Sequence, residues 1–312
     1  KWFGNYAAML WLLVAQAAAM VIVSQVTSVR RYAWAWNRAL FARMARFGWP
    51  LLLNGVLMFL IWQGDRILVG SGYDMTQLAL YSVAMTVTSP PTDLLTKASS
   101  TVLLPPLARA QDDKERFGEL YAFLAQALSL GGIAFATLFI ILGPSIIELL
   151  YGARYAGVGA FIGWFAVLQT LRLIRVAPTT AVLALGDTLG CLLANLGRAA
   201  CFPGLLILTF TGQPLFWLVV ASCGGEVLAL GLLLERTRRL HSLSIGLSLK
   251  ALFLSLCAIV AAGAIAIANG PTLSVAAVAG AGCVVALASL ATLLVFPDFR
   301  RRLISVKEIR SA

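Results

Sequence analysis

The chain has 312 residues, of which 60% are hydrophobic and 12% are charged, and its mean hydropathy is +0.89. A soluble globular domain carries about a quarter charged residues, so this composition excludes that class and predicts an integral membrane protein. The formal net charge of +11 lies on basic residues scattered over separate stretches. A nucleic-acid partner would require those residues interleaved with stacking aromatics on one surface, so none is expected.

Membrane-length apolar runs recur along the whole chain. A helix needs roughly 20 mostly apolar residues to cross the hydrocarbon core, and the connections between the runs are mostly short, which leaves no room for a large soluble domain. The sequence therefore predicts an all-α polytopic membrane protein with about nine transmembrane helices. In chain order, these helices are expected at residues 3–28, 47–71, 78–104, 119–147, 157–185, 189–210, 214–234, 246–268 and 273–296.

Basic residues gather in connections on one side of the predicted spans. They follow the first, third and seventh predicted spans and fill the C-terminal tail, whereas the connections on the other side hold only Arg154. The positive-inside rule then places the odd-numbered connections and the C-terminus in the cytoplasm.

The chain opens with KWFGNY, without an initiator Met or a signal-peptide pattern, so we expect it to be the C-terminal part of a longer protein. Residues 30–46, RRYAWAWNRALFARMAR, are basic and aromatic. Two interpretations stay open for them: an amphipathic helix on the cytoplasmic membrane surface, or a linker whose long side chains snorkel to the headgroups.

Ionisable residues lie inside the second and third predicted spans, where a purely structural membrane helix would carry none. They are Asp65, Arg66, Asp93 and Lys97. A charge at membrane depth costs a few kcal/mol or more, so such a residue usually faces a bundle interior or a water-filled cavity. The two spans therefore predict a transport path.

Polar residues of the third predicted span recur at steps of three and four, which places them on one face of a helix. This face consists of Ser82, Thr86, Ser89, Asp93, Lys97 and Ser100. Pro90 and Pro91 lie in its middle and predict a kink or a local break. Two interpretations stay open: the face lines a cavity, or Asp93 and Lys97 neutralise each other one helical turn apart.

The fifth and sixth predicted spans carry arginines at membrane depth. Their polar positions are Gln169, Arg172, Arg175, Thr179, Asn195 and Arg198. Two arginines three residues apart repel each other unless an anion or water lies between them. Snorkelling is the alternative for Arg172 and Arg175, but about ten residues separate them from the cytoplasmic end of their span, a depth of about 15 Å.

Basic residues outnumber acidic ones by two at membrane depth. The basic set is Arg66, Lys97, Arg172, Arg175 and Arg198, and the acidic set is Asp65, Asp93 and Glu226. A cationic cavity attracts an anionic cargo, and the planar fork of arginine suits phosphate. The sequence therefore predicts the sign of the substrate and leaves its identity open.

Motifs of enzymes and metal sites are missing from the sequence. It contains no phosphate-binding loop ending in GK[ST] and no HExxH pair, and its single histidine, His241, lies in a predicted loop. The five cysteines lie in apolar segments without CxxC spacing, so we expect them to pack as small apolar side chains. The expected protein is not an enzyme and uses no cofactor and no metal.

The run GDRILVGSGYDMTQLALYSVAMTVTSPPTDLLTKASSTVLLPPLAR resembles paired helices of the polysaccharide flippases in the multidrug/oligosaccharidyl-lipid/polysaccharide exporter superfamily. These have Asp-Arg near the end of one span, a Leu-x-x-Tyr-Ser-x-Ala start to the next, and a proline at its cytoplasmic exit. The matching residues here are Asp65, Arg66, Leu78, Tyr81, Ser82, Ala84 and Pro105. The later stretch LALGDTLGCLLANLGRAA is similar to a turn between spans of the second lobe, so the resemblance extends over most of residues 30–240.

The resemblance implies a two-lobed exporter, with six helices in each lobe around a central cavity. This chain would then hold the second lobe and two extra C-terminal helices. The implied parts are the last helix of the first lobe (1–29), a basic cytoplasmic linker (30–46), the second six-helix lobe (47–236), two accessory transmembrane helices (237–297) and a basic cytoplasmic tail (298–312).

The resemblance also implies a function, which is to flip an undecaprenyl-pyrophosphate-linked oligosaccharide across the bacterial inner membrane for polysaccharide export. The implied partners are this anionic lipid-linked oligosaccharide, membrane lipids, and polysaccharide polymerase and assembly proteins. Substrate binding is expected of Lys97, Arg172, Arg175, Arg198, Gln169 and Asn195, and counter-charge or ion coupling of Asp65, Asp93 and Glu226.

Two other functions stay open. A cation-coupled multidrug exporter of the same superfamily would favour a net acidic cavity, opposite to the excess of basic residues found here. A non-transporting membrane subunit of a polysaccharide assembly complex is the second alternative.

Overall fold

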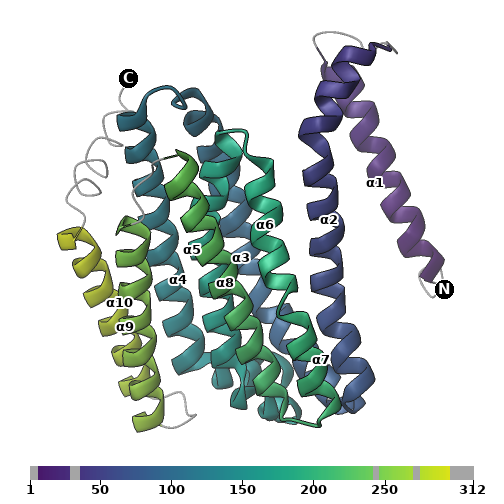
Figure 1. The fold of residues 1–312 in the computed structure, drawn as a ribbon. Helices are drawn as coiled ribbons and strands as arrows, with labels where there is room; N and C mark the ends of the chain where they lie inside the picture. The colour runs from purple at the N-terminus through teal and green to yellow at the C-terminus, as the bar shows by residue number, and fades with distance from the viewer. Residues whose placement is uncertain (1–5, 29–35, 242–245, 270–274, 296–312) are drawn as a thin grey trace. The chain divides into compact units, whose positions relative to one another are not determined.

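A computed structural model describes residues 6–28, 36–241, 246–269 and 275–295. All regular structure in these ranges is helical, which confirms the all-α class. The chain divides into two compact units, residues 1–46 and 47–312. The helices are α1 Tyr6–Thr27, α2 Arg38–Gly72, α3 Met75–Arg109, α4 Lys114–Tyr151, η1 Ala153–Ala160, α5 Ile162–Ala184, α6 Thr188–Ala199, α7 Phe202–Phe210, α8 Leu215–His241, α9 Gly246–Asn269 and α10 Val275–Val295 (Figure 1).

The protein is a multi-pass membrane protein. Among the described residues, five stretches are long and apolar enough to cross a membrane, and the bent pair η1 and α5 adds a sixth. The polar stripe and four prolines of α3 keep it out of this set. Each of the nine expected spans corresponds to a helix or a helix pair, but the number that cross the membrane stays a prediction.

The first unit contains α1, whose residues 10–27 are all exposed. This stretch has a mean hydropathy of 1.8, and none of its residues is buried. A continuous apolar surface of this kind is unstable in water, so it requires lipid or another protein surface as its environment.

The basic stretch before the second predicted span is only partly described. Residues 29–35 lie outside the described ranges, and the helix α2 begins at Arg38 and continues through the predicted span. The Trp36 and Phe41 rings stack with their centroids 5.0 Å apart. Residues 38–46 are therefore the first turns of α2.

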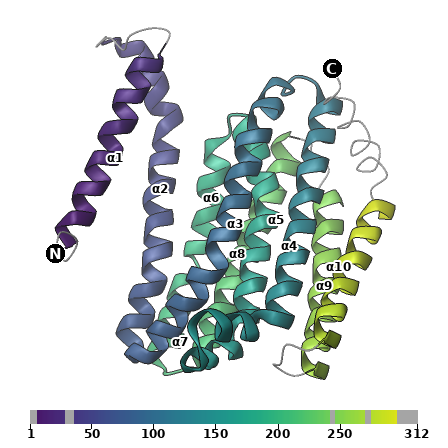
Figure 2. The same ribbon diagram turned by 180° about the vertical axis from the view of Figure 1, so that it is seen from behind.

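Consecutive spans of the second unit run in alternating directions (Figures 1 and 2). The α3–α4 and α5–α6 connections lie at one end of these helices, which we call the basic end because Arg109, Lys114 and Arg236 lie there. The connections at residues 73–74 and 211–214 lie at the opposite end and are joined, since the Tyr73 hydroxyl donates to the carbonyl oxygen of Gln213 at 2.7 Å. Arg154 also lies at that opposite end.

The core of the second unit is built around the packing of α4 on α5. The Thr170 hydroxyl of α5 donates to the Gly132 carbonyl oxygen of α4 at 3.0 Å. A Cβ atom at Gly132 would lie 2.9 Å from Thr170 Cγ2, so only glycine permits this approach. On the other side of α4, the hydroxyls of Ser129 and Ser255 lie 3.0 Å apart and connect α4 to α9.

The helix breaks do not fall where the prolines of α3 predicted them. The helix α3 is continuous through Pro90 and Pro91, so the local break that the sequence allowed there does not occur. A break occurs instead in the sixth predicted span, where α6 ends at Ala199 and α7 begins at Phe202. Pro203 lies in the first turn of α7, where a missing backbone N–H leaves no helical hydrogen bond unmade.

Candidate functional site: a buried arginine–glutamate cluster

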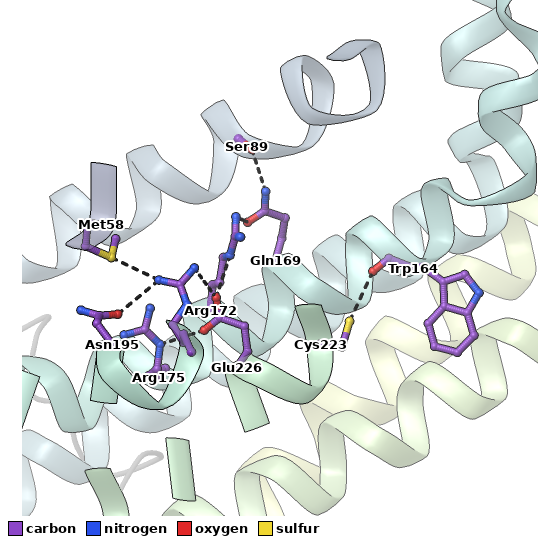
Figure 3. A network of polar contacts seen from close by, with 10 residues as sticks. Met58, Ser89, Trp164, Gln169, Arg172, Arg175, Asn195, Cys223 and Glu226 are labelled. Atoms are coloured by element: carbon purple, nitrogen blue, oxygen red, sulfur yellow. Dashed lines mark hydrogen bonds and ion pairs between the residues drawn. The ribbon is translucent and has the colours of Figure 1, made fainter. Parts of the chain in front are cut away.

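Three arginines converge on one carboxylate in the interior of the second unit (Figure 3). Arg172 Nε lies 3.0 Å from Glu226 Oε1, and Arg198 Nη2 lies 2.8 Å from the same oxygen. Arg175 Nε lies 3.0 Å from the other oxygen, Oε2. The Glu226 side chain is only 1% exposed, and the arginine side chains are between 4% and 14% exposed. We call these four residues the arginine cluster.

Helical spacing and close packing bring the cluster together. Arg172 and Arg175 are three residues apart on α5, so they share one face, and this face meets α8, which carries Glu226. Arg198 comes from the last turn of α6. Its neighbour Gly197 permits close contact of α6 with α8, because a Cβ there would lie 2.6 Å from Leu232 Cδ1.

Glu226 supplies the anion that the spacing of the arginines requires. Buried charges are stable only when they are paired and hydrogen-bonded. A single carboxylate is nevertheless one charge against three, so a second carboxylate is needed nearby. Asp65 of α2 is 8% exposed and lines a cavity of about 20 Å³ together with Arg172, Arg198 and Glu226. With Asp65 included, the cluster retains an excess of one positive charge.

Hydrogen bonds extend the cluster toward α3. Arg172 Nη1 donates to Gln169 Oε1 at 3.4 Å, and Gln169 Nε2 donates to Ser89 Oγ at 2.7 Å. The Trp62 ring of α2 lies 5.8 Å from Arg172 Cζ, which is within the range of a cation–π contact. Ser89 belongs to the polar face predicted for α3, so this face does meet the arginine face of α5.

A second set of contacts extends the cluster toward α2. Arg198 Nη1 lies 3.2 Å from both Asn195 Oδ1 and Met58 Sδ, and Asn195 Nδ2 donates to Asn54 Oδ1 at 2.6 Å. Asn54, Met58 and Trp62 were not among the site residues predicted from the sequence. They could have been found from spacing, because the set Asn54, Met58, Trp62 and Asp65 recurs at steps of four, four and three on one helical face.

A cavity of about 220 Å³ lies beside the cluster, between α2, α3, α5 and α6. Of the three arginines, only Arg175 lines it. Its polar lining includes Ser100 and Thr179, which the polar stripes predicted, and Asn54, Thr96 and Thr180. The remaining lining residues are Leu51, Met58, Val176, Leu183, Cys191 and Asn195.

Two of the expected site residues lie apart from the cluster. Lys97 is exposed and Asp93 is half-buried. The ion pairs among the described residues do not include a direct contact between Asp93 and Lys97. Asp93 lies within electrostatic range of both Arg172 and Lys97. The roles expected of Asp93 and Lys97 stay predictions, whereas Gln169, Asn195 and the other five residues come together in one network.

These features define a class: a helical multi-pass membrane protein with a cationic polar cluster buried beside a cavity. The family model described as polysaccharide biosynthesis protein matches residues 2–159, more than half of the chain. The chain therefore belongs to the polysaccharide biosynthesis protein family. The match includes the run from Asp65 to Pro105 on which the resemblance was based, and it ends before Arg172. No curated protein and no solved structure matches the chain.

Proposed function

We propose that this chain belongs to a transporter that moves an undecaprenyl-pyrophosphate-linked oligosaccharide across the bacterial inner membrane for polysaccharide export. The observation that carries the proposal is the net positive arginine cluster beside a cavity at membrane depth. Charged residues buried at this depth are usually functional, and arginine forms the strongest hydrogen bonds to phosphate oxygens. Membership of the polysaccharide biosynthesis protein family supports the choice of cargo.

In this proposal the protein binds and releases its cargo and makes or breaks no bond of it. The arginines provide positive charge and planar donors for the pyrophosphate, and Glu226 and Asp65 provide the counter-charges that keep the empty site stable. The odd-numbered connections and the C-terminus face the cytoplasm, where the lipid-linked unit is loaded. Polysaccharide polymerase and assembly proteins receive it on the other side.

A non-transporting role in a polysaccharide assembly complex is the second candidate. The observation that favours it is that Glu226 already accepts hydrogen bonds or ion pairs from all three arginines, which is what a purely structural network would do. The multidrug-exporter alternative is disfavoured, since an organic cation would be repelled by the excess positive charge of the cluster.

The test is polysaccharide export in a bacterium that lacks its own transporter and expresses the full-length protein containing this chain. Arg172→Gln and Arg175→Gln each remove a charged donor, and a charge-assisted hydrogen bond contributes about 1.5–3 kcal/mol, so export should fall about tenfold or more. Arg154→Gln is the matched control, because Arg154 is exposed and lies outside the cluster. Unchanged export by the Arg172 and Arg175 variants, at protein levels equal to the control, would support the structural candidate instead.

A further inference from the structure

We propose that Glu226 occupies the place of the cargo's phosphate, and that a phosphate ester or anhydride entering the cavity of about 220 Å³ replaces the Glu226 carboxylate as the partner of Arg175. The inference rests on the proposed function and adds to it the residue that exchanges partners. Arg175 would be the binding residue, and Arg172 and Arg198 would hold Glu226 in position.

The two carboxylate oxygens of Glu226 are held by different numbers of arginines. Arg172 and Arg198 both contact Oε1, whereas Arg175 alone contacts Oε2. If Arg175 turns to another anion, Glu226 still keeps two arginine partners. A buried carboxylate left without partners would be strongly destabilising, so this arrangement permits one contact to exchange while the charge stays paired.

Arg175 lines the cavity of about 220 Å³. It is the only arginine of the cluster among the residues that line this cavity. Its Nε donates to Glu226, and the hydrogen bonds found among the described residues use neither of its two terminal nitrogens. These nitrogens provide the forked pair of donors that binds phosphate oxygens.

The wall of this cavity contains hydrogen-bond donors besides Arg175. The Asn54 oxygen is occupied as an acceptor from Asn195, which directs the Asn54 amide nitrogen to be used as a donor. Thr96 and Ser100 add hydroxyl donors from α3. The cavity volume of about 220 Å³ is below the roughly 300–1,000 Å³ of pockets for drug-sized ligands and is large enough for a phosphate group.

Binding of radiolabelled inorganic pyrophosphate tests the exchange, with the full-length protein in nanodiscs and magnesium-free buffer. Arg175→Gln should weaken binding about tenfold or more, since it removes the contacting charge. Glu226→Gln should tighten binding about tenfold, since it removes the competing carboxylate. Arg154→Gln is the control and should bind like the wild type. If Glu226 only stabilised the fold, Glu226→Gln would not bind pyrophosphate more tightly than the wild type. Weaker or unchanged binding by Glu226→Gln therefore overturns the inference.

Two further measurements keep the test decisive if Glu226→Gln is poorly folded. Glu226→Asp retains the charge but is one methylene shorter, so it should loosen the Arg175 contact and tighten binding to a lesser degree. Pyrophosphate should also raise the unfolding temperature of either Glu226 variant more than that of the wild type, because the anion replaces the lost partner. Equal shifts in variant and wild type would contradict the inference.

A competition arm identifies the source of the phosphate. A polyprenyl pyrophosphate placed in the nanodisc lipid should displace the labelled pyrophosphate if the site takes a lipid headgroup. If labelled pyrophosphate binds but is not displaced, the site takes free phosphate. That outcome supports the exchange of partners at Arg175 and contradicts the proposed cargo. A third outcome is that export is lost in Arg175→Gln while Glu226→Gln does not bind pyrophosphate more tightly. This combination would support the transport function and contradict the exchange of partners.

Discussion

At the scale of single residues, the arginine cluster is asymmetric. Arg198 is the most deeply buried of the arginines, with 4% of its side chain exposed, yet it is one of three partners of Glu226. Glu226 is a direct partner of all three. Removing the carboxylate leaves three buried cations, whereas removing one arginine leaves a carboxylate with two partners.

We therefore expect Glu226→Gln to destabilise the protein more than Arg198→Met. Loss of a buried partner costs about 3–5 kcal/mol when a charge is left unpaired, whereas Arg198→Met retains most of the side-chain volume and should cost roughly 1–3 kcal/mol. Unfolding of the purified protein by titration with SDS would measure both free energies. The expectation is wrong if Arg198→Met proves the more destabilising change.

At the scale of helices, one aspartate orients α6 relative to α8. Gly186, with φ at +74°, ends α5 in the left-handed conformation that favours glycine, and Asp187 follows it. Asp187 Oδ1 accepts from the Gly190 N–H at 3.1 Å and so caps α6. Both oxygens of Asp187 also pair with Arg236 of α8, at 2.7 and 2.8 Å. This contact joins the start of α6 to α8 at the basic end, whereas Arg198 lies in the last turn of α6.

Substitutions of Asp187 should separate its two roles. Asp187→Ala removes the cap and the ion pair and should lower the free energy of unfolding by about 2–3 kcal/mol, whereas Asp187→Asn keeps a capping oxygen and should lower it by about 1 kcal/mol. Asp113→Ala is the control, because Asp113 caps α4 by accepting from the Arg116 N–H at 3.1 Å. The same SDS titration applies, and equal losses for Asp187→Ala and Asp113→Ala would mean that the ion pair with Arg236 contributes nothing.

At the scale of the whole molecule, the helices separate the connections into two sets. The helix α4 has 38 residues, so at 1.5 Å per residue it is roughly 57 Å long, well beyond the hydrocarbon thickness of about 30 Å. We therefore expect residues 110–113 and 152–161, which flank it, to lie on opposite sides of the membrane. The positive-inside rule assigns the first of these connections to the cytoplasm.

Single cysteines would check this orientation. In a full-length variant without the five native cysteines, Asp112→Cys and Ala156→Cys each add one thiol at an exposed position. A membrane-impermeant maleimide applied to intact spheroplasts should label Ala156→Cys, and should label Asp112→Cys only after the membrane is permeabilised. The reverse pattern would invert the topology, and labelling of both in intact spheroplasts would contradict a membrane crossing by α4.

The sequence alone determined where the long apolar helices lie and which of their faces are polar. Helix formation and the composition of a helix face depend on residues three and four positions apart. The shared face of Arg172 and Arg175 and the polar stripe that contains Ser89 were therefore predictable. The family was predictable from the run between Asp65 and Pro105, because its spacing is local as well.

Tertiary structure decided which of these faces meet. Glu226 lies 28 or more positions from each of its partners in the sequence, and no local pattern shows that one carboxylate serves three arginines. The exclusion of Lys97 from the cluster and the break between α6 and α7 also depend on how the helices pack. The physical reason is that periodicity defines a helix face, whereas burial, and with it the pairing of charges, is set by the neighbouring helices against which that face packs.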